Sequence, residues 1–267
     1  MNIHPTAVID PTAELDSSVR VGPYTVIEKG VKIGADTEVG PHVVISGPTT
    51  IGVGNRISSF ANIGAPPQDI NYKGEDTRLE IGDHNIIREF TSLHRGTASG
   101  RGLTTIGNNN MLMAYVHIAH DCQVGNHVIL ANSANLAGHV IVEDRCTMGG
   151  LVAVHQFSRI GEYAYVGGMS GISKDVPPYL MVSGIRNSTR VTGINKVGLK
   201  RAGFDSEVIM QLNRAFKILF RSDELVLQDA LSKAETEFAD CAPVQHLVKF
   251  FRESERGVVR TAGENDF

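Results

Sequence analysis

Large aliphatic residues recur at every sixth position along the first two thirds of the chain. A run of eleven opens the sequence, three follow a first interruption, and twelve follow a second. These anchor positions are Ile3, Ile9, Leu15, Val21, Ile27, Ile33, Val39, Ile45, Ile51, Ile57 and Ile63, then Ile81, Ile87 and Leu93, then Ile106, Leu112, Ile118, Val124, Leu130, Leu136, Val142, Met148, Val154, Ile160, Val166 and Ile172. A period of six fits neither an α-helix nor an alternating strand.

A six-residue repeat is the signature of a parallel β-helix. Each hexad makes one flat face, three hexads close a triangular turn of 18 residues, and residues 18 apart stack at the ordinary strand spacing of about 4.8 Å. The 26 hexads predict between eight and nine turns. The spacing does not fix the hand of the coil, for which right-handed crossovers are the general rule.

Two segments, 69–80 and 99–105, break the period. Continuing the repeat through the first would place Asp69 and Glu75 in an apolar core, where an unpaired charge is costly. The second segment holds seven residues, one more than a hexad, so it shifts the phase of the repeat by one residue. Both are predicted to be loops that leave from one edge of the prism, because each follows a hexad of a single column. That column consists of the hexads that begin at 63, 93, 118, 136, 154 and 172. Long excursions of this kind usually carry function.

The chain changes character after Ile172, and Pro177-Pro178 halts the repeat. From about Asn195 onward the apolar spacing is helical, most clearly over 208–220, and two more helical segments follow near 224–238 and 243–253. We therefore predict a parallel β-helix domain over 1–186, with excursions at 69–80 and 99–105, and a small α-helical C-terminal domain over 187–267.

Composition excludes several classes of protein. The formal net charge is -4 in 267 residues without long charge runs, which gives no reason to expect nucleic acid. The sequence has neither a signal peptide at its start nor a stretch of about 20 apolar residues, so we expect a cytoplasmic protein without a membrane span. The three cysteines, Cys122, Cys146 and Cys241, form no CxxC motif and are predicted to be reduced thiols.

Five of the ten histidines fall in the column from which both loops leave. They are His94, His117, His120, His139 and His155. In the predicted coil His120, Gly138 and Gln156 share one row, and Asp121 shares the next row with His139. Such clustering favours a functional site over scattered structural histidines. For His120 the alternative, a solvated histidine on a β-helix face, is disfavoured by its neighbours, whereas a structural role beside the loop is at least as well supported for His94 as a functional one.

The local stacking supplies a general base, its orienting carboxylate and an oxyanion donor in His120, Asp121 and the N–H of Gly138. No Ser, Cys or Thr lies in a recognisable nucleophile motif. Direct attack by a substrate group, without a covalent enzyme intermediate, is the simpler mechanism. We predict no metal and no cofactor.

The segments His117-Ile118-Ala119-His120-Asp121-Cys122, Leu136-Ala137-Gly138-His139-Val140 and Ala153-Val154-His155-Gln156-Phe157 resemble the active strip of the UDP-N-acetylglucosamine acyltransferases. The likeness extends to Gln68-Asp69 and to Gly198-Leu199-Lys200-Arg201, and it covers nearly the whole chain. It implies a left-handed coil and a homotrimer. It also implies transfer of a 3-hydroxyacyl group, carried on the phosphopantetheine of acyl carrier protein, to the 3-position of UDP-N-acetylglucosamine in lipid A synthesis.

The resemblance also implies roles for single residues. His120 would be the base, Asp121 its partner and Gly138 the oxyanion donor. Substrate binding would fall to Asp69, His117, His139, His155 and Gln156, with Asn195 and Arg201 near the uridine diphosphate, and Gly168 where the family measures acyl-chain length. Two departures stand out: Asn71 and Ala202 occupy positions where the family usually has Lys and Arg.

Other functions remain open at this point. A related sugar-nucleotide N-acyltransferase shares the repeat, but its extra N-terminal domain is not expected because the repeat begins at Ile3. A zinc-dependent hydratase of the γ-type carbonic anhydrase kind would use three histidines across a subunit boundary, with His117 and His120 as two of them. A scaffold without catalytic activity would bind a partner through its loops. An amino group in place of the sugar 3-hydroxyl is a further possibility.

Overall fold

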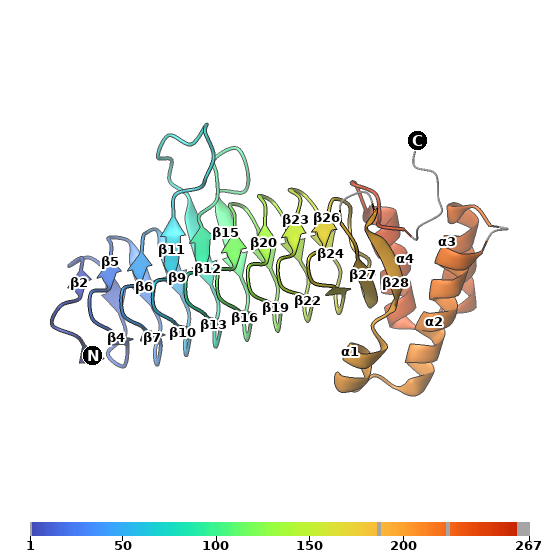
Figure 1. Cartoon of the computed structure of the whole chain (residues 1–267), viewed down its shortest axis with the longest axis horizontal. Coiled ribbons are helices and arrows are strands. Elements are labelled where there is room, and N and C mark those ends of the chain that lie inside the picture. Colours follow the sequence, from blue (N-terminus) through green and yellow to red (C-terminus); the bar gives the residue numbers. More distant parts are fainter. Residues whose placement is uncertain (1, 186–187, 223–224, 261–267) are drawn as a thin grey trace.

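The computed structural model describes residues 2–185, 188–222 and 225–260. It is a long stack of turns with helices at one end, and the chain begins at the other end (Figure 1). Within the described residues, short strands group into three sheets, which we call faces A, B and C.

Face A has eleven strands, ten of them parallel and the last antiparallel. They are β1 (Asn2–Ile3), β4 (Arg20–Val21), β7 (Glu38–Val39), β10 (Arg56–Ile57), β13 (Ile86–Ile87), β16 (Met111–Leu112), β19 (Ile129–Leu130), β22 (Thr147–Met148), β25 (Tyr165–Val166), β27 (Leu180–Ser183) and β28 (Arg190–Ile194).

Faces B and C are parallel throughout, with nine and eight strands. Face B consists of β2 (Val8–Ile9), β5 (Val26–Ile27), β8 (Val44–Ile45), β11 (Asn62–Ala65), β14 (Ser92–His94), β17 (His117–Ile118), β20 (Asn135–Leu136), β23 (Ala153–Val154) and β26 (Gly171–Ile172). Face C consists of β3 (Glu14–Leu15), β6 (Val31–Ile33), β9 (Thr49–Ile51), β12 (Arg78–Ile81), β15 (Leu103–Ile106), β18 (Gln123–Val124), β21 (Ile141–Val142) and β24 (Arg159–Ile160).

The strand register follows the predicted turn of 18 residues. Ile3 pairs with Val21, for example, and the same spacing recurs along the regular part of the coil. Across the first interruption Arg56 pairs with Ile86, and across the second Ile86 pairs with Met111. Each interruption therefore adds its own residues to one turn and leaves the stacking of the next turn intact.

The anchors of the repeat form the core. Every anchor from Val21 to Ile172 is buried, whereas Ile3 in the first turn is 37% exposed. Among the described residues no turn lies over the first one, and its aliphatic side chains are partly open to solvent. A single apolar column therefore runs the length of the prism and holds its three faces together.

The two loops leave face B after β11 and β14 and rise from the same side of the prism (Figure 1). Their predicted ends are too late, because β12 begins at Arg78 and β15 at Leu103. The residues before the anchor already pair across face C, as Leu79 does with Thr49 and Thr104, and Leu79 is fully buried. Counting hexads from their anchors misses this extra strand pairing.

The C-terminal part begins differently from the prediction. The predicted boundary at 186–187 lies outside the described residues, and the segment after it opens with β28, which pairs with β27 as an antiparallel hairpin. The helices follow: α1 (Lys196–Arg201), α2 (Ser206–Arg221), α3 (Leu227–Glu237) and α4 (Ala242–Glu253). None of the helices in the described ranges is long and apolar enough to cross a membrane.

The chain turns back to the coil after α4. We call residues 254–260 the return segment. Val258 forms a parallel bridge with Asp175, Asp175 N–H donates to Gly257 O at 2.9 Å, and Val259 N–H donates to Asp175 O at 2.9 Å. Val258 and Val259 are buried. The end of the described chain thus belongs to the last turn of the β-helix.

Candidate active site

The predicted histidines gather on face B and on the edge where face B meets face C. We call this the B–C edge, and it consists of residues 119–122, 137–140 and 155–158, which follow β17, β20 and β23. Because the turns stack in register, residues from three separate hexads lie one above another there. Both loops leave from the same edge.

His120 and Asp121 form the central pair of the B–C edge. His120 Nδ1 lies 2.9 Å from Asp121 Oδ2, with the imidazole 19% exposed and the carboxylate fully buried. Since an ionised carboxylate only accepts hydrogen bonds, Nδ1 carries the proton, and Nε2 of a neutral ring keeps a free lone pair. This is the arrangement of a general base with its orienting partner.

The second loop encloses Asp121. The Thr97 hydroxyl donates to Oδ2 at 2.6 Å, Thr97 N–H reaches the carboxylate at 3.1 Å, and Arg101 N–H donates to Oδ1 at 2.9 Å. Burial alone would raise the pKa of the Asp121 carboxyl, but the hydrogen bonds from Thr97 and His120 outweigh it and hold the pKa below its ordinary value. Asp121 is therefore ionised at neutral pH.

Gly138 lies directly against the His120 ring. A Cβ placed on Gly138 would come within 2.7 Å of His120 Nε2, so any side chain here would displace the imidazole. In the described part of the chain the Gly138 N–H has no hydrogen-bond acceptor. The glycine therefore leaves both an open space beside Nε2 and an unused donor.

His139 closes one side of this space. Its ring meets the His120 ring edge to face, with centroids 5.1 Å apart, and stacks on Phe157 at 4.4 Å. His139 Nε2 is 3.8 Å from Asp121 Oδ2. Burial lowers the pKa of the His139 imidazole, so the ring is neutral at pH 7 and presents a polar but uncharged wall.

His117 and His94 lie together on face B beside the pair. His117 Nδ1 is hydrogen-bonded to Ser92 Oγ at 2.8 Å, and His94 Nδ1 donates to Pro66 O at 2.7 Å. The two ring centroids are 5.1 Å apart. Burial, with a smaller contribution from His94, lowers the pKa of His117 to about 4. Both rings can offer hydrogen bonds without adding positive charge to the site.

The first loop, which leaves from the same edge, carries Asp69, whose charge opposes slightly the lowering of the His139 pKa by burial. Asn71 N–H and the Asn71 amide donate to Asp69 Oδ1 at 2.9 and 3.3 Å, so Asn71 orients the aspartate. The buried Arg95 anchors the loop: its guanidinium donates to Gly47 O and Gly64 O and, at 3.2 Å, to the Tyr72 hydroxyl.

His155 and Gln156 are exposed at the far end of the B–C edge. His155 Nδ1 lies 3.1 Å from Gln156 O and 3.3 Å from Nη2 of Arg256, which belongs to the return segment. The helical part thus contributes a side chain to the strip of histidines.

Three predicted site residues lie elsewhere in the chain. Gly168 follows β25, at the edge between faces A and B, and is exposed. Asn195 caps α1 by accepting from Gly198 N–H at 3.0 Å, and its amide donates to Tyr163 O. Arg201 is exposed in the last turn of α1, which lies on the side of the prism opposite the loops (Figure 1). The side chain of Asn195 is therefore engaged within its own chain.

Comparison with known proteins shows the family of the chain. The family model described as UDP-N-acetylglucosamine O-acyltransferase, domain 2, matches residues 175–259, and the bacterial transferase hexapeptide model matches 12–47 and 103–138. A relative from Halorhodospira halophila is 53% identical over 97% of this chain and 99% of its own length. One from Janthinobacterium sp. is 51% identical, again over 97% and 99%. Both are named acyl-(acyl-carrier-protein)–UDP-N-acetylglucosamine O-acyltransferase.

The chain belongs to the UDP-N-acetylglucosamine O-acyltransferase family. The solved O-acyltransferase from Moraxella catarrhalis has a TM-score of 0.93 at 46% identity over 97% of this chain and 100% of its own. That from Bacteroides fragilis has a TM-score of 0.93 at 41% identity over 96% and 99%. The predicted fold class, a left-handed parallel β-helix followed by a small helical part, is confirmed.

The candidate site on the B–C edge also contains a group of ligand-type side chains. Among the described residues, His120, Asp121 and His139 are the one set of three whose donor atoms lie within 4.8 Å of one another. His117, which the hydratase alternative would need, is not part of this set. The family assignment does not favour that alternative, nor the N-acyltransferase or the scaffold.

Sequence reasoning missed several residues of the acyltransferase site. Thr97 and Ser92 hold Asp121 and His117, Arg256 reaches His155 from the return segment, and Tyr72 holds Arg95, which anchors the first loop. Only the position of Ser92 could have been found, because it lies one turn before His117 in the column. Tyr72 and Arg256 lie outside the repeat, where spacing gives no information. Thr97 belongs to the hexad that begins at Leu93, but the structure places it in the second loop, between β14 and β15, so its hexad position does not predict its contact with Asp121.

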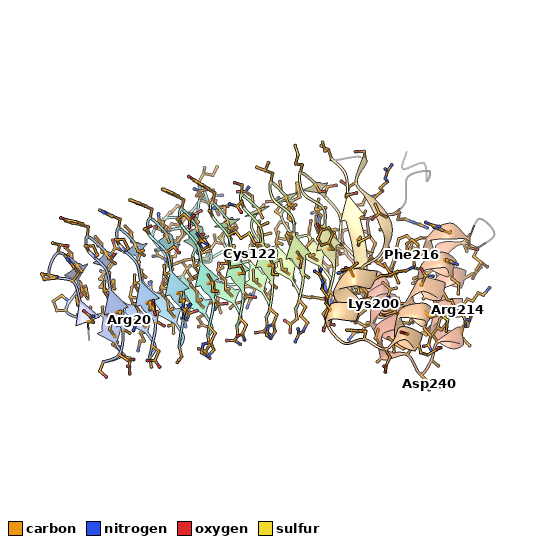
Figure 2. All side chains as sticks on the ribbon, turned by 60° about the horizontal axis from the view of Figure 1, so that its bottom comes forward. Arg20, Cys122, Lys200, Arg214, Phe216 and Asp240 are labelled. Atoms are coloured by element: carbon orange, nitrogen blue, oxygen red, sulfur yellow. The ribbon has the colours of Figure 1, made fainter. Side chains whose placement is uncertain are left out.

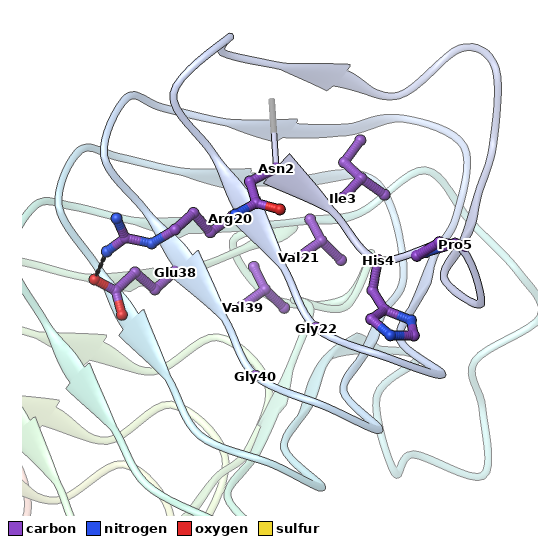
Figure 3. Close-up of a pocket in the computed structure, with 10 residues that line it drawn as sticks. All are labelled: Asn2, Ile3, His4, Pro5, Arg20, Val21, Gly22, Glu38, Val39 and Gly40. Carbon is purple, nitrogen blue, oxygen red and sulfur yellow. Dashed lines mark hydrogen bonds and ion pairs between the residues drawn. The ribbon is translucent and has the colours of Figure 1, made fainter.

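A pocket at the opposite end of the molecule contains none of the predicted site residues. It lies on face A of the first turns and is lined by Asn2, Ile3, His4, Pro5, Arg20, Val21, Gly22, Glu38, Val39 and Gly40 (Figure 3). An ion pair between Arg20 and Glu38 crosses it. The absence of clustered imidazoles there makes the B–C edge the stronger candidate.

Proposed function

We propose that this chain transfers a 3-hydroxyacyl group from acyl carrier protein to the 3-hydroxyl of UDP-N-acetylglucosamine, the step that opens lipid A synthesis. The names of the relatives support the two substrates. The observation that carries the chemistry is the buried His120–Asp121 pair beside Gly138. An activated thioester and a sugar hydroxyl need a base and an oxyanion donor, and no further cofactor.

In the proposed mechanism, His120 Nε2 takes the proton of the sugar hydroxyl while that oxygen attacks the thioester carbon. The Gly138 N–H donates to the resulting oxyanion. Collapse expels the thiolate, which receives the proton back from the imidazolium, so that an ester and a free thiol are the products. Asp121 holds the ring throughout and stabilises its transient positive charge.

The neutral imidazoles around the pair suit an acceptor made of hydroxyl and amide groups. We assign sugar-nucleotide contacts to His117, His139, His155, Gln156 and Asp69, all of which lie on face B, on the B–C edge or in the first loop. Gly168 is proposed to limit acyl-chain length, because its exposed surface leaves room that a side chain would fill.

A homotrimer would bring the remaining residues to the site. Asn195 and Arg201 lie away from the histidines of their own chain, so we assign them to the site of a neighbouring subunit. In that assembly the acidic carrier protein would dock on basic side chains of the helical part, where Lys200 and Arg214 stand on α1 and α2 (Figure 2). Reduced thiols suit the cytoplasm, the compartment that we propose, and all three cysteines are buried without a disulfide.

The test is a transfer assay with purified protein, UDP-N-acetylglucosamine and a mixed pool of 3-hydroxyacyl carrier proteins. We expect an ester at the sugar 3-position, located by NMR, and a restricted range of acyl lengths by mass spectrometry. Turnover should persist after exhaustive chelation. An amide product made only from a 3-amino sugar would favour the N-acyltransferase alternative, and activity that needs zinc would favour the hydratase.

A further inference from the structure

Arg256 is a cation near the strip of histidines, and neither the repeat nor the family resemblance assigns it. The return segment fixes its position from both sides. Ser254 Oγ donates to Asp175 Oδ2 at 2.7 Å, and Val258 bridges the backbone of Asp175. Asp175 is itself buried and accepts from Arg159 N–H at 2.8 Å. The backbone that carries Arg256 is therefore tied to the last turn of the coil.

The guanidinium of Arg256 is poorly satisfied by the groups around it. Its Nη2 contacts are long, 3.3 Å to His155 Nδ1 and 3.4 Å to Ser173 O, where a good N–H···O bond is about 2.9 Å. The contact with His155 also competes with Gln156 O, because Nδ1 cannot donate to the carbonyl and accept from arginine together. Its Nε is buried without a partner among the described residues.

Other arginines near the same junction have carboxylate partners. Arg159 contacts Glu143 at 2.6 Å, and Arg252 makes a two-pronged pair with Glu235 at 2.9 and 2.6 Å. In the described part of the chain Arg256 has no such ion pair. Burying an N–H group without a hydrogen-bond acceptor costs free energy, and a bound anion would supply the missing acceptor. The planar guanidinium, with its parallel N–H donors, matches the oxygens of a phosphate.

The distance between Arg256 and His120 along the coil indicates which substrate phosphate Arg256 can bind. His155 and Ser173, the two contacts of Arg256, lie two and three turns beyond Ala119, the residue before His120. At the strand spacing of about 4.8 Å per turn, Arg256 is about 10–14 Å from His120 along the axis of the coil. About five bonds separate the sugar 3-oxygen from the first phosphorus of a nucleotide sugar, and about seven from the second. At ordinary bond lengths the two phosphorus atoms lie about 6–9 Å from the 3-oxygen, and the contacts of His120 with that oxygen and of the guanidinium with the phosphate add about 3 Å each, so the diphosphate can span the distance to Arg256. The phosphate of an extended phosphopantetheine arm lies about 14 bonds from the thioester carbon, at about 17 Å, so this arm would have to fold back to place its phosphate at Arg256, whereas the diphosphate reaches Arg256 from an extended sugar nucleotide.

We infer that Arg256 and His155 form an anion subsite for the diphosphate of the sugar nucleotide, supplied by the same chain that carries His120. This inference rests on the proposed function and adds to it. When the diphosphate binds, the guanidinium donates to a phosphate oxygen in place of His155 Nδ1. The His155 Nδ1–H then donates to Gln156 O.

The test compares Arg256→Ala and Arg256→Lys with Arg252→Ala, which removes a neighbouring arginine already satisfied by Glu235. Loss of a charge-assisted contact predicts a rise of about tenfold or more in the KM for UDP-N-acetylglucosamine in Arg256→Ala. Arg256→Lys, which keeps the charge without the fork, should lose less. The KM for the acyl donor, kcat and the thermal unfolding temperature should change little, and Arg252→Ala should resemble the wild type in every respect.

Binding of UDP alone, followed by calorimetry, separates this subsite from catalysis. Arg256→Ala should weaken UDP binding by a similar factor, with a flatter dependence on salt. Equal KM values for the nucleotide in wild type and Arg256→Ala would overturn the inference.

A second comparison separates the two sources of phosphate. Acyl-pantetheine lacks the phosphate of acyl-phosphopantetheine, so a defect of Arg256→Ala seen only with the phosphorylated donor would overturn the assignment to the nucleotide. An inactive wild-type protein would instead count against the proposed function, while the UDP measurement still tests the subsite.

Discussion

At the scale of single residues, the site depends on one buried carboxylate. Asp121 has no exposed surface, yet it stays ionised because Thr97, Arg101 and His120 all donate to it. A charge held in this way fixes the tautomer of His120 and leaves Nε2 as the base. In the proposed mechanism the base therefore depends on Thr97 and Arg101, which hold the carboxylate that orients it.

Thr97→Val tests this dependence, because it removes the hydroxyl but keeps the shape of the side chain. We expect kcat to fall about tenfold, the cost of one hydrogen bond to a charged group. The pKa of Asp121 should rise, since the Thr97 hydroxyl helps to lower it, so the acidic limb of the pH–rate profile should move to higher pH. Thr236→Val, whose hydroxyl bonds only to Ser232 O on exposed α3, is the control. An unshifted profile in Thr97→Val would contradict the assignment.

His117 predicts a pH dependence of stability. Its pKa is about 4 in the folded protein and about 6.5 in the unfolded chain, so between these values the unfolded state binds more protons. Stability contributed by the neutral ring is present above pH 6.5 and is lost as the pH falls toward 4, by about 2 kcal/mol. Chemical denaturation between pH 7 and 4 should show that the free energy of unfolding falls less steeply with pH for His117→Gln than for wild type. Parallel curves would contradict this role of burial.

At the scale of elements, regular spacing explains what could be predicted. The hexads, the column of histidines and the edge from which both loops leave all follow from the period of six, because stacked turns copy one position onto the next. The contacts of Thr97 with Asp121 and of Arg256 with His155 do not follow from this period. A loop and a return segment place their residues through single contacts, such as Arg95 with Tyr72, that leave no periodic trace.

Tyr72→Phe tests whether those contacts position the first loop. The change removes a hydroxyl that accepts from Arg95 and donates to Glu75 O at 2.8 Å. Because this loop carries Asp69, we expect the KM for the sugar nucleotide to rise three- to tenfold with kcat nearly unchanged, a loss of about 1 kcal/mol. Tyr115→Phe, at an exposed ring of the coil, serves as the matched control. Equal KM values for Tyr72→Phe and Tyr115→Phe would exclude the loop from substrate binding.

At the scale of the whole molecule, one apolar column supports every face. Leu130 is fully buried in it, whereas Ile129 on the same strand points outward and is 38% exposed. Leu130→Ala should cost about 2–5 kcal/mol and still fold. Leu130→Asp should not yield folded protein, because it buries a charge without a partner. Ile129→Asp should fold, as judged by circular dichroism and thermal unfolding. A well-folded Leu130→Asp would contradict the proposed packing of the column.

The hand of the coil and the assembly of subunits also belong to this scale, and spacing alone predicts neither. The left hand is implied by the resemblance to the acyltransferases, and the structural relatives confirm it. The positions of Asn195 and Arg201, away from the histidines of their own chain, are the reason to expect a neighbour's contribution. Sequence could not reveal this, because a repeat describes stacking within one chain and not contacts between chains.

The most direct test of the central claim is the turnover of His120→Ala with UDP-N-acetylglucosamine and a 3-hydroxyacyl carrier protein, measured beside its unfolding temperature. The account predicts a folded variant with kcat about 1,000-fold below wild type, as expected for loss of a general base. A folded variant whose kcat stays within tenfold of wild type would show that the B–C edge does not supply the base.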